Sequence, residues 1–487
     1  MRGGHATPDV HAAGPAAVVV GGGISGLVAA RELAMAGAAV TVLEASDAWG
    51  GCVGSHVVAG LQLDSGAESF ATRSTAVADL ARELGLADRI VAPRPGGAWV
   101  QLPDDPRELP KTGVLGIPAN PWDPEVRRSL GFSGAIRASV DRWLPAAIGT
   151  SSDVTSVSSL VRARMGKRVL ERLVSPVVGG VHSADPSLLD VDMVAPGLRA
   201  GVRKHGSLAA AVAAQRRGSA SGPAGPAKAG SAVAGLKGGM NTLVAALVAD
   251  LRERGVELIA GKRADTVVMT PGGWRVGAGE TVYDAGRLVV ALDGPAAVGL
   301  LEQSLPELAA LRPEPGPLVS LVTMVVDLPE LDGRPRGTGI LVAPQTPGIK
   351  AKALTHATAK WDWLADEAGP GTHVLRLSYG RREEARGGVE DVVLDDESLL
   401  AAALKDATTL LTVPVSQADI VDWDVVRWAG ALPFAAVGHK QRVAQVRKLC
   451  ARANGLSVVG GWLAGNGLAA VVADTRAQVA AESAGAA

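Results

Sequence analysis

The sequence predicts an α/β fold in which a nucleotide-binding domain is interrupted by an inserted, largely antiparallel sheet and a helical subdomain. Glycine-gated strand–helix units stand near both ends of the chain, at 17–36 and at 457–484. Between them lie short strand-like segments rich in β-branched residues, a pattern typical of an antiparallel sheet. Because the two end units can meet at one ligand, we expect the stretch between them to form an inserted substrate domain.

The first unit has the form of a strand, a glycine turn and a helix. Residues 17–20 are a short apolar run, suited to a parallel strand buried on both faces, and residues 21–26 fit G-x-G-x-x-G. Gly21 permits the tight turn, and Gly23 lets a pyrophosphate approach the backbone. Gly26 lets the following helix pack close to the strand, so the unit predicts a Rossmann-type domain.

An acidic residue at the end of the next strand strengthens this prediction. The helix is expected at 24–36 and the second strand at 40–43, which ends at Glu44. A lone G-x-G-x-x-G occurs by chance in a chain with 61 glycines, but here it follows a strand and opens a helix. Glu44 is placed to accept hydrogen bonds from an adenosine ribose, so the site should bind the ADP half of FAD or NAD. A carboxylate there disfavours the 2′-phosphate of NADP.

The pattern of elements and composition predicts a chain divided into alternating parts. Residues 121–200 are expected to be mainly helical, including an amphipathic helix at 161–174 whose basic face is expected to be solvated. Strands are expected at 318–327, 339–342, 351–355, 374–379 and 420–428. The expected parts are a flexible N-terminus (1–15), a dinucleotide-binding domain in three pieces (16–90, 234–300 and 431–487), a helical substrate subdomain (91–210), a disordered Gly/Ser/Ala/Pro-rich loop (211–233) and a substrate-binding sheet domain (301–430).

Charge and residue counts exclude several classes of function. The chain has 487 residues and a net charge of −1, so it offers no basic field for nucleic acid. Its two cysteines, Cys52 and Cys450, are far apart, which fits a reducing, cytoplasmic compartment. The eight histidines are scattered without ligand spacing, so no metal is expected. No segment qualifies as a signal peptide or a transmembrane helix.

The inventory of motifs narrows the chemistry. Only one good dinucleotide fingerprint is present, whereas a flavin reductase that uses NAD(P)H would normally need two. There is no C-x-x-C for disulfide chemistry and no Ser-His-Asp signature. The simplest enzyme that fits is a flavoprotein oxidase or dehydrogenase that passes electrons to oxygen or another small acceptor.

Several blocks resemble a known family almost from end to end. They are VVGGGISGL (19–27), GAESF (66–70), LPKTGVLGIP (109–118), SPVVGGVHSAD (175–185) and WLAGNGL (462–468). The first is shared by many FAD enzymes, and the middle three are more specific. Together they resemble the FAD-dependent protoporphyrinogen/coproporphyrinogen III oxidases of haem biosynthesis, within the monoamine-oxidase-like flavoprotein superfamily, with actinobacterial coproporphyrinogen III oxidases most similar.

The resemblance implies a cofactor, a reaction and site residues. It implies that FAD takes a hydride from a methylene bridge of a porphyrinogen and that oxygen reoxidises it with release of H2O2. The aromaticity gained drives the reaction, so no catalytic protein base is implied. By position, the implied FAD contacts are Gly21, Gly22, Gly23, Ile24, Ser25, Gly26, Glu44, Ala45, Cys52, Gly66, Ala67, Glu68, Ser69, Ala264, Trp428, Asn466, Gly467 and Leu468. The four propionates of coproporphyrinogen III need cations, for which the candidates are Arg73, Lys111 and Lys352.

Some positions depart from the family pattern and keep alternatives open. Ala48, Ala435 and Ala464 stand where the family has polar residues, and Cys52 replaces a Lys, Arg or Trp. The expected function is oxidation of coproporphyrinogen III; protoporphyrinogen IX oxidase, an FAD-dependent amine oxidase and a non-catalytic FAD-binding protein are the alternatives. The expected partners are a porphyrinogen and molecular oxygen, with no nucleic acid. The sequence leaves open a peripheral membrane contact and transient contacts with other haem-synthesis enzymes.

Overall fold

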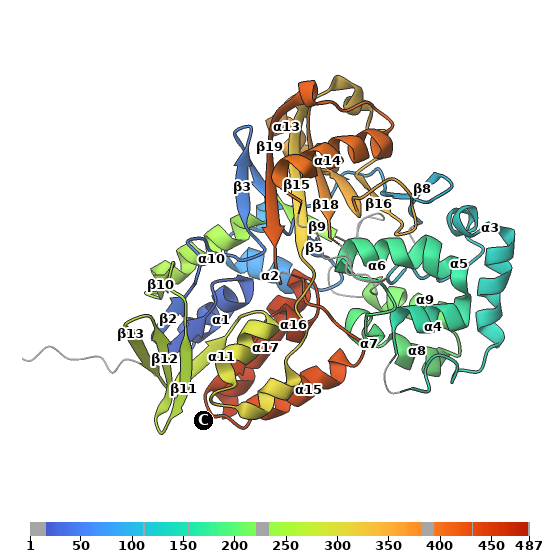
Figure 1. Cartoon of the computed structure of the whole chain (residues 1–487). Coiled ribbons are helices and arrows are strands. Elements are labelled where there is room, and N and C mark those ends of the chain that lie inside the picture. Colours follow the sequence, from blue (N-terminus) through green and yellow to red (C-terminus); the bar gives the residue numbers. More distant parts are fainter. Residues whose placement is uncertain are drawn as a thin grey trace, which may run out of the picture.

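A computed structural model describes residues 16–110, 113–152, 155–220, 233–380, 394–430 and 432–485 of the chain (Figure 1). Its centre is a five-stranded sheet whose strand pairs are all parallel. The strand order is β10 (Glu257–Ile259), β2 (Val40–Leu43), β1 (Ala17–Val20), β14 (Arg287–Val290) and β20 (Leu456–Val458). Three separate stretches of sequence therefore build one sheet, as the expected α/β fold requires.

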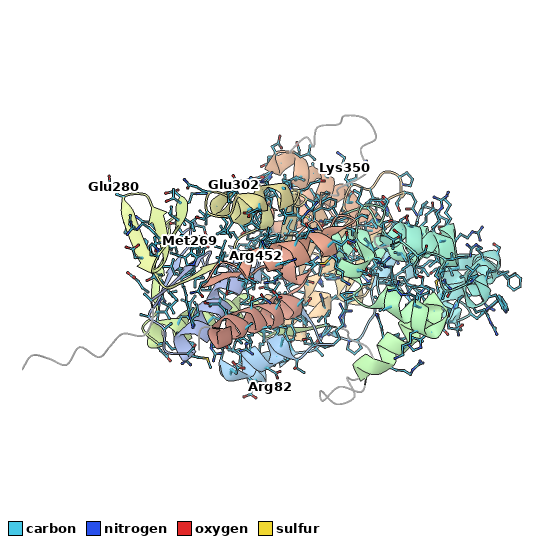
Figure 2. The ribbon with its side chains drawn as sticks, turned by 90° about the horizontal axis from the view of Figure 1, so that it is seen from below. Arg82, Met269, Glu280, Glu302, Lys350 and Arg452 are labelled. Carbon is cyan, nitrogen blue, oxygen red and sulfur yellow. The ribbon has the colours of Figure 1, made fainter. Side chains whose placement is uncertain are left out.

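Alternating side chains of this sheet enter two hydrophobic cores. Ala17 and Val19 pack with α1 (Ile24–Met35), α10 (Asn241–Glu253) and α17 (Leu468–Gly485). Val18 and Val20 face the other side, which is covered by the antiparallel sheet β11–β13 and by two helices. The bounds on that side are β11 (Thr266–Thr270), β12 (Gly273–Ala278), β13 (Thr281–Ala285), α11 (Gly294–Leu301) and α15 (His439–Cys450). Figure 2 shows this layering from below, with Arg82 marking α2 (Ala76–Glu83) and Glu280 marking the tip of the β12–β13 hairpin.

A second, mixed sheet stands above the first in Figure 1. Its order is β19 (Ile420–Trp428), β15 (Val319–Asp327), β18 (Thr372–Tyr379), β17 (Ala353–His356), β16 (Gly339–Val342), β7 (Trp99–Gln101) and β8 (Pro106–Glu108), with only β16–β7 parallel. All five strands expected between 318 and 428 are confirmed. The sheet also takes two strands from 99–108, which the expected sheet domain of 301–430 did not include.

The two faces of the second sheet have different neighbours. Met324 and Leu375 belong to the core shared with α14 (Asp396–Leu411). Val325 and Val374, on the opposite face, pack against the hairpin of β3 (Ser55–Val58) and β4 (Leu61–Asp64). This second face therefore looks toward the nucleotide-binding domain. Short elements complete the junction: β5 (Phe70–Ala71), β6 (Ile90–Val91), β9 (Val233–Leu236), α12 (Ala357–Lys360), α13 (Asp362–Ala368) and α16 (Gly461–Ala464).

The helical subdomain projects to one side of the two sheets (Figure 1). It comprises α3 (Pro124–Ser139), α4 (Val157–Met165), α5 (Lys167–Val169), a π-helical stretch (Leu170–Val174), α6 (Ser175–His182), α7 (Val191–Val194), α8 (Leu198–His205) and α9 (Leu208–Ala220). In the described part of the chain, no helix is both long enough and apolar enough to span a membrane.

The expected amphipathic helix at 161–174 is wrong in two respects. Gly166, with φ of +90°, ends α4 and separates it from α5. Arg164 is fully buried instead of solvated. Its Nε donates to Asp141 Oδ1 at 2.5 Å, and its other nitrogens donate to main-chain carbonyls such as that of Ile148 at 3.1 Å. The guanidinium thus fastens the surrounding loops together, a use that helical spacing alone does not reveal.

The expected disordered loop at 211–233 is wrong over its first ten residues, because α9 continues to Ala220. Leu208, Ala211 and Val212 are buried in the core of the helical subdomain, and alanine favours the helix. Val233 is already the first residue of β9. The rest of the expected loop and the expected flexible N-terminus lie outside the described residues.

Candidate active site

The glycine turn between β1 and α1 has the shape that a pyrophosphate needs. A Cβ on Gly26 would lie 1.8 Å from the carbonyl oxygen of Gly21, so only glycine allows this contact between helix and strand. Gly21 itself has a φ of +105°. A Cβ on Gly23 would meet nothing within 4 Å, which leaves open space in front of the first turn of α1. Backbone N–H groups at a helix N-terminus bind phosphate, so this space suits a pyrophosphate.

Glu44 lies where the adenosine half would bind. Its Oε2 accepts from the N–H of Gly22 at 2.6 Å, and its Oε1 accepts from the N–H and the hydroxyl of Ser46, both at 2.8 Å. A carboxylate has about four acceptor sites, so three protein donors leave about one for a ribose hydroxyl. Main-chain bonds from Glu44 to Ile259 and Lys262 place the segment with Ala264 alongside.

At the other end of the site, a tight turn meets the segment around Cys52. We call residues 64–69, where the sequence resemblance implies contacts with FAD, the flavin-side turn. The N–H of Ala67 donates to the carbonyl of Cys52 at 2.9 Å, and a Cβ on Gly66 would lie 2.1 Å from that carbonyl oxygen. Trp428 Nε1 donates to Ser65 O at 2.7 Å. The structure therefore brings together Cys52, the flavin-side turn and Trp428. Burial raises the pKa of the Cys52 thiol, so this residue supplies no charge.

The carboxylate of Glu68 is already engaged by protein cations. It pairs with Lys360 and, at 2.8 Å, with Nη2 of Arg376. Desolvation opposes the ionised form, but the two cations dominate and lower the pKa of Glu68 to about 2. A contact of Glu68 with FAD, as the resemblance implies, would therefore be made most simply by its backbone.

The C-terminal block supplies a second helix N-terminus. Asn466 and Gly467 lie between α16 and α17, and α17 begins at Leu468. Asn466 Nδ2 donates to Val181 O at 3.1 Å and lies 3.4 Å from Nδ1 of His182. Both α1 and α17 follow strands of the same parallel sheet, so both begin at its carboxyl edge, where ligands bind in open α/β sheets.

A small pocket lies beside this block. It encloses about 240 Å³ including its open mouth, and its lining includes His182, Met193, His439, Trp462 and Asn466. Burial lowers the pKa of His182 to about 4, so the imidazole is neutral near pH 7. Sequence reasoning missed His182 as a site residue. The available signal lies in the block 175–185, where His182 takes the place of a tyrosine in the pattern of the porphyrinogen oxidase family.

The three candidate propionate-binding cations have different surroundings. Arg73 is exposed between β5 and α2, and it has no ion-pair partner among the residues that the structure describes. Lys352 is only 2% exposed, and its Nζ donates to the hydroxyl of Ser183 and, at 3.2 Å, to Gly380 O. Lys111 lies outside the described residues. The substrate roles of all three stay predictions.

The three alanines that depart from the family pattern make packing contacts and main-chain hydrogen bonds. The carbonyl of Ala48 accepts from the hydroxyl of Ser46 at 2.9 Å, and that of Ala435 accepts from the N–H of Asp190 at 2.8 Å. Ala464 packs against the core that contains α1 and α17. None of these three side chains adds a polar group to the site.

A parallel sheet with two glycine-gated helix N-termini at its carboxyl edge, facing a second sheet, is the arrangement of a dinucleotide-binding oxidoreductase. The match to the family model "Flavin containing amine oxidoreductase" extends over residues 24–485. The chain belongs to this family and, within it, to the FAD-dependent protoporphyrinogen/coproporphyrinogen III oxidases. FAD is its cofactor, and the open space at Gly23 and the remaining acceptor site of Glu44 fit it.

Curated relatives and solved structures agree with this assignment. The coproporphyrinogen III oxidase of Propionibacterium freudenreichii subsp. freudenreichii is 30% identical over 94% of this chain and 89% of that protein. The enzyme of the same name from Mycobacterium leprae is 31% identical over 88% and 90%. A crystal structure from Exiguobacterium sp. 255-15, assigned provisionally as a protoporphyrinogen oxidase, matches with a TM-score of 0.77, 25% identity and coverage of 96% and 98%. Cyclohexylamine oxidase from Brevibacterium oxydans shares the fold, with a TM-score of 0.66, 16% identity and coverage of 97% and 99%.

Proposed function

We propose that this protein oxidises coproporphyrinogen III to coproporphyrin III in haem biosynthesis. The observation that carries the proposal is end-to-end similarity to curated coproporphyrinogen III oxidases, in a chain that also has a complete dinucleotide cradle. Held by residues 21–26 and Glu44, FAD would supply the chemistry of hydride acceptance from a methylene bridge and of transfer of two electrons to oxygen. Three such rounds convert one porphyrinogen and three O2 into one porphyrin and three H2O2, which balances six hydrogens.

The contribution of the chain is binding and orientation. The α1 N-terminus and Glu44 would hold the pyrophosphate and the adenosine, and the flavin-side turn would position the ring end. His182 is neutral at working pH, so its Nδ1 can accept a hydrogen bond from Asn466. No strong protein base is required for loss of the pyrrole proton, because the aromaticity gained by the product drives the oxidation. Arg73 is our first candidate for a propionate contact.

A fluorimetric assay tests the reaction class. Purified protein with FAD in air should generate porphyrin fluorescence from coproporphyrinogen III and should release no H2O2 with putrescine as substrate. Porphyrin formation no faster than in the protein-free control, with FAD bound, would overturn the proposal. H2O2 formation from putrescine would instead favour an amine oxidase of the same fold.

We propose further that the helical subdomain makes a peripheral contact with anionic membrane lipid, from a cytoplasmic location. Phe132, Ile136 and Trp143 lie on α3 and the following 3₁₀ turn and are 67%, 47% and 68% exposed. Trp122 packs edge-to-face on Phe132 at 5.7 Å, and the Arg142 guanidinium lies 4.7 Å from the ring of Trp143. We call these residues the aromatic patch. Aromatic and aliphatic side chains interleaved with arginines are typical of surfaces that lie on anionic bilayers.

Co-sedimentation with vesicles tests this contact. We expect binding to vesicles rich in phosphatidylglycerol, weak binding to pure phosphatidylcholine, and a loss of about fivefold or more in the double variant Phe132→Ser/Trp143→Ser. Val57→Ser/Val421→Ser is the matched control, because those side chains are 63% and 57% exposed on β3 and β19. Equal binding of both double variants to the vesicles would contradict a role of the aromatic patch in membrane binding. Transient contacts with other haem-synthesis enzymes stay a prediction.

A further inference from the structure

Two side chains of the second sheet bind three consecutive carbonyl groups of the flavin-side turn. Arg376 Nη1 donates to Asp64 O at 3.1 Å and to Gly66 O at 2.9 Å. The carbonyl between them, Ser65 O, accepts from Nε1 of Trp428 at 2.7 Å. Arg376 lies on β18 and Trp428 at the end of β19, so the turn is held from the sheet that forms the substrate domain.

The same guanidinium also binds the side chain at the end of this segment. Its Nη2 lies 2.8 Å from Glu68 Oε2, and Lys360 pairs with the other oxygen of that carboxylate. The side chains of all three residues are only 14–15% exposed. Arg376 therefore contacts residues 64, 66 and 68 at once, through two carbonyls and one carboxylate, inside the junction between the sheets. A guanidinium can do this because its donors form a rigid planar fork.

The nucleotide-binding domain holds the opposite side of the turn. The N–H of Ser65 donates to Gly54 O at 3.0 Å, and the N–H of Ala67 donates to Cys52 O at 2.9 Å. The carboxylate of Asp64 accepts from the N–H groups of Met240 at 3.0 Å and Asn241 at 3.2 Å, at the start of α10. Backbone groups of one short turn are thus shared between two domains, and Arg376 supplies most of the contacts from the substrate side.

We propose that Arg376 is a positioning residue that fixes the flavin-side turn to the substrate sheet. It thereby sets the position of the FAD ring relative to the sheet on which the substrate is bound. The inference rests on FAD binding at this turn, within the proposed function, but not on which porphyrinogen is oxidised. Loss of the guanidinium removes the donor to two carbonyls and to one oxygen of the Glu68 carboxylate, whose other oxygen stays paired with Lys360. The turn can then shift without a change in any group that contacts the substrate.

The test compares Arg376→Met and Arg376→Lys with Arg427→Met. Arg427 lies on β19 of the same sheet, separated from β18 by β15, where it donates to Leu394 O at 2.8 Å and pairs with Asp396 at 2.5 Å. Arg427 is paired with Ser320 of β15, whereas Arg376 is paired with Thr323 of the same strand, so the two arginines lie on opposite faces of the sheet. The control therefore removes a similar arginine from the face that points away from the nucleotide-binding domain. The readouts are the visible circular dichroism of bound FAD, the FAD dissociation constant, and kcat and KM for coproporphyrinogen III.

For Arg376→Met we expect an altered flavin dichroism spectrum, FAD binding weakened about tenfold and kcat lowered about tenfold, with KM changed by less than about threefold. Arg376→Lys should recover part of each loss, and Arg427→Met should match the parent. An unaltered spectrum and kcat in Arg376→Met would overturn the proposal. If that variant does not fold, Arg376→Lys decides, and parental values for it would also overturn the proposal. The spectrum and the FAD affinity need no porphyrinogen, so a failure of the proposed function is distinguishable from a failure of this inference.

Discussion

Substitution of Gly23 by valine separates FAD binding from folding. A Cβ at this position would meet nothing within 4 Å, and the backbone has φ of −69° and ψ of 175°, which other residues adopt readily. The free energy of unfolding of the apoprotein should therefore change by less than about 1 kcal/mol. The valine side chain would fill the space expected for the pyrophosphate and remove its approach to the N-terminus of α1. We expect FAD affinity to fall by about 100-fold or more, equivalent to about 2.7 kcal/mol.

The matched contrast is Gly26→Ala, three residues along the same turn. Its Cβ would lie 1.8 Å from the carbonyl oxygen of Gly21, so this smaller side chain should destabilise the apoprotein itself. Thermal unfolding of the apoproteins and fluorescence titration with FAD distinguish the two variants. Normal FAD content in Gly23→Val would refute the assignment of residues 21–26 as the pyrophosphate-binding site. A large loss of apoprotein stability in Gly23→Val would contradict the open space in front of Gly23.

Two other predictions concern charge. Burial raises the pKa of Asp64 from 3.8 to about 6. The folded state therefore binds the carboxyl proton of Asp64 more tightly than the unfolded state does. The stability that this proton contributes is lost as the pH rises from about 4 to about 6. Relative to Asp64→Asn, the parent should lose about 1.5 kcal/mol of unfolding free energy between pH 4.5 and pH 6, and parallel stability curves would contradict this. The variant is needed because buried histidines such as His356, whose pKa burial lowers to about 3, change stability in the opposite direction. Arg73→Ala should raise KM for coproporphyrinogen III by about tenfold while FAD content stays normal; an unchanged KM would remove Arg73 from the substrate site.

The local parts of the site could be predicted from sequence. The cradle at Gly21–Gly26 and the position of Glu44 depend on neighbours within one strand–helix–strand unit, and β-branched runs located the strands of the second sheet. The hydrogen bonds from Arg376 to the flavin-side turn could not be predicted, because Arg376 and Gly66 are 310 positions apart and only the folded sheet brings them together.

Burial of charge was also beyond sequence reasoning. Helical spacing placed Arg164 on a basic face, but the break at Gly166 and the ion pair with Asp141 turn it inward. Charge alone makes Lys352 a candidate for binding a propionate, whereas the structure places its ammonium against Ser183 and Gly380. In both cases the partner groups lie 23 or more positions away in the sequence, beyond the reach of helical spacing.

A competition between two substrates tests most directly whether the protein oxidises coproporphyrinogen III. Purified protein with bound FAD is given equal concentrations of coproporphyrinogen III and protoporphyrinogen IX in air, and initial rates of the two porphyrins are measured after chromatographic separation, against a protein-free control. Faster formation of coproporphyrin III is the result that we predict. Faster formation of protoporphyrin IX, or rates equal to the control for both, would contradict the account.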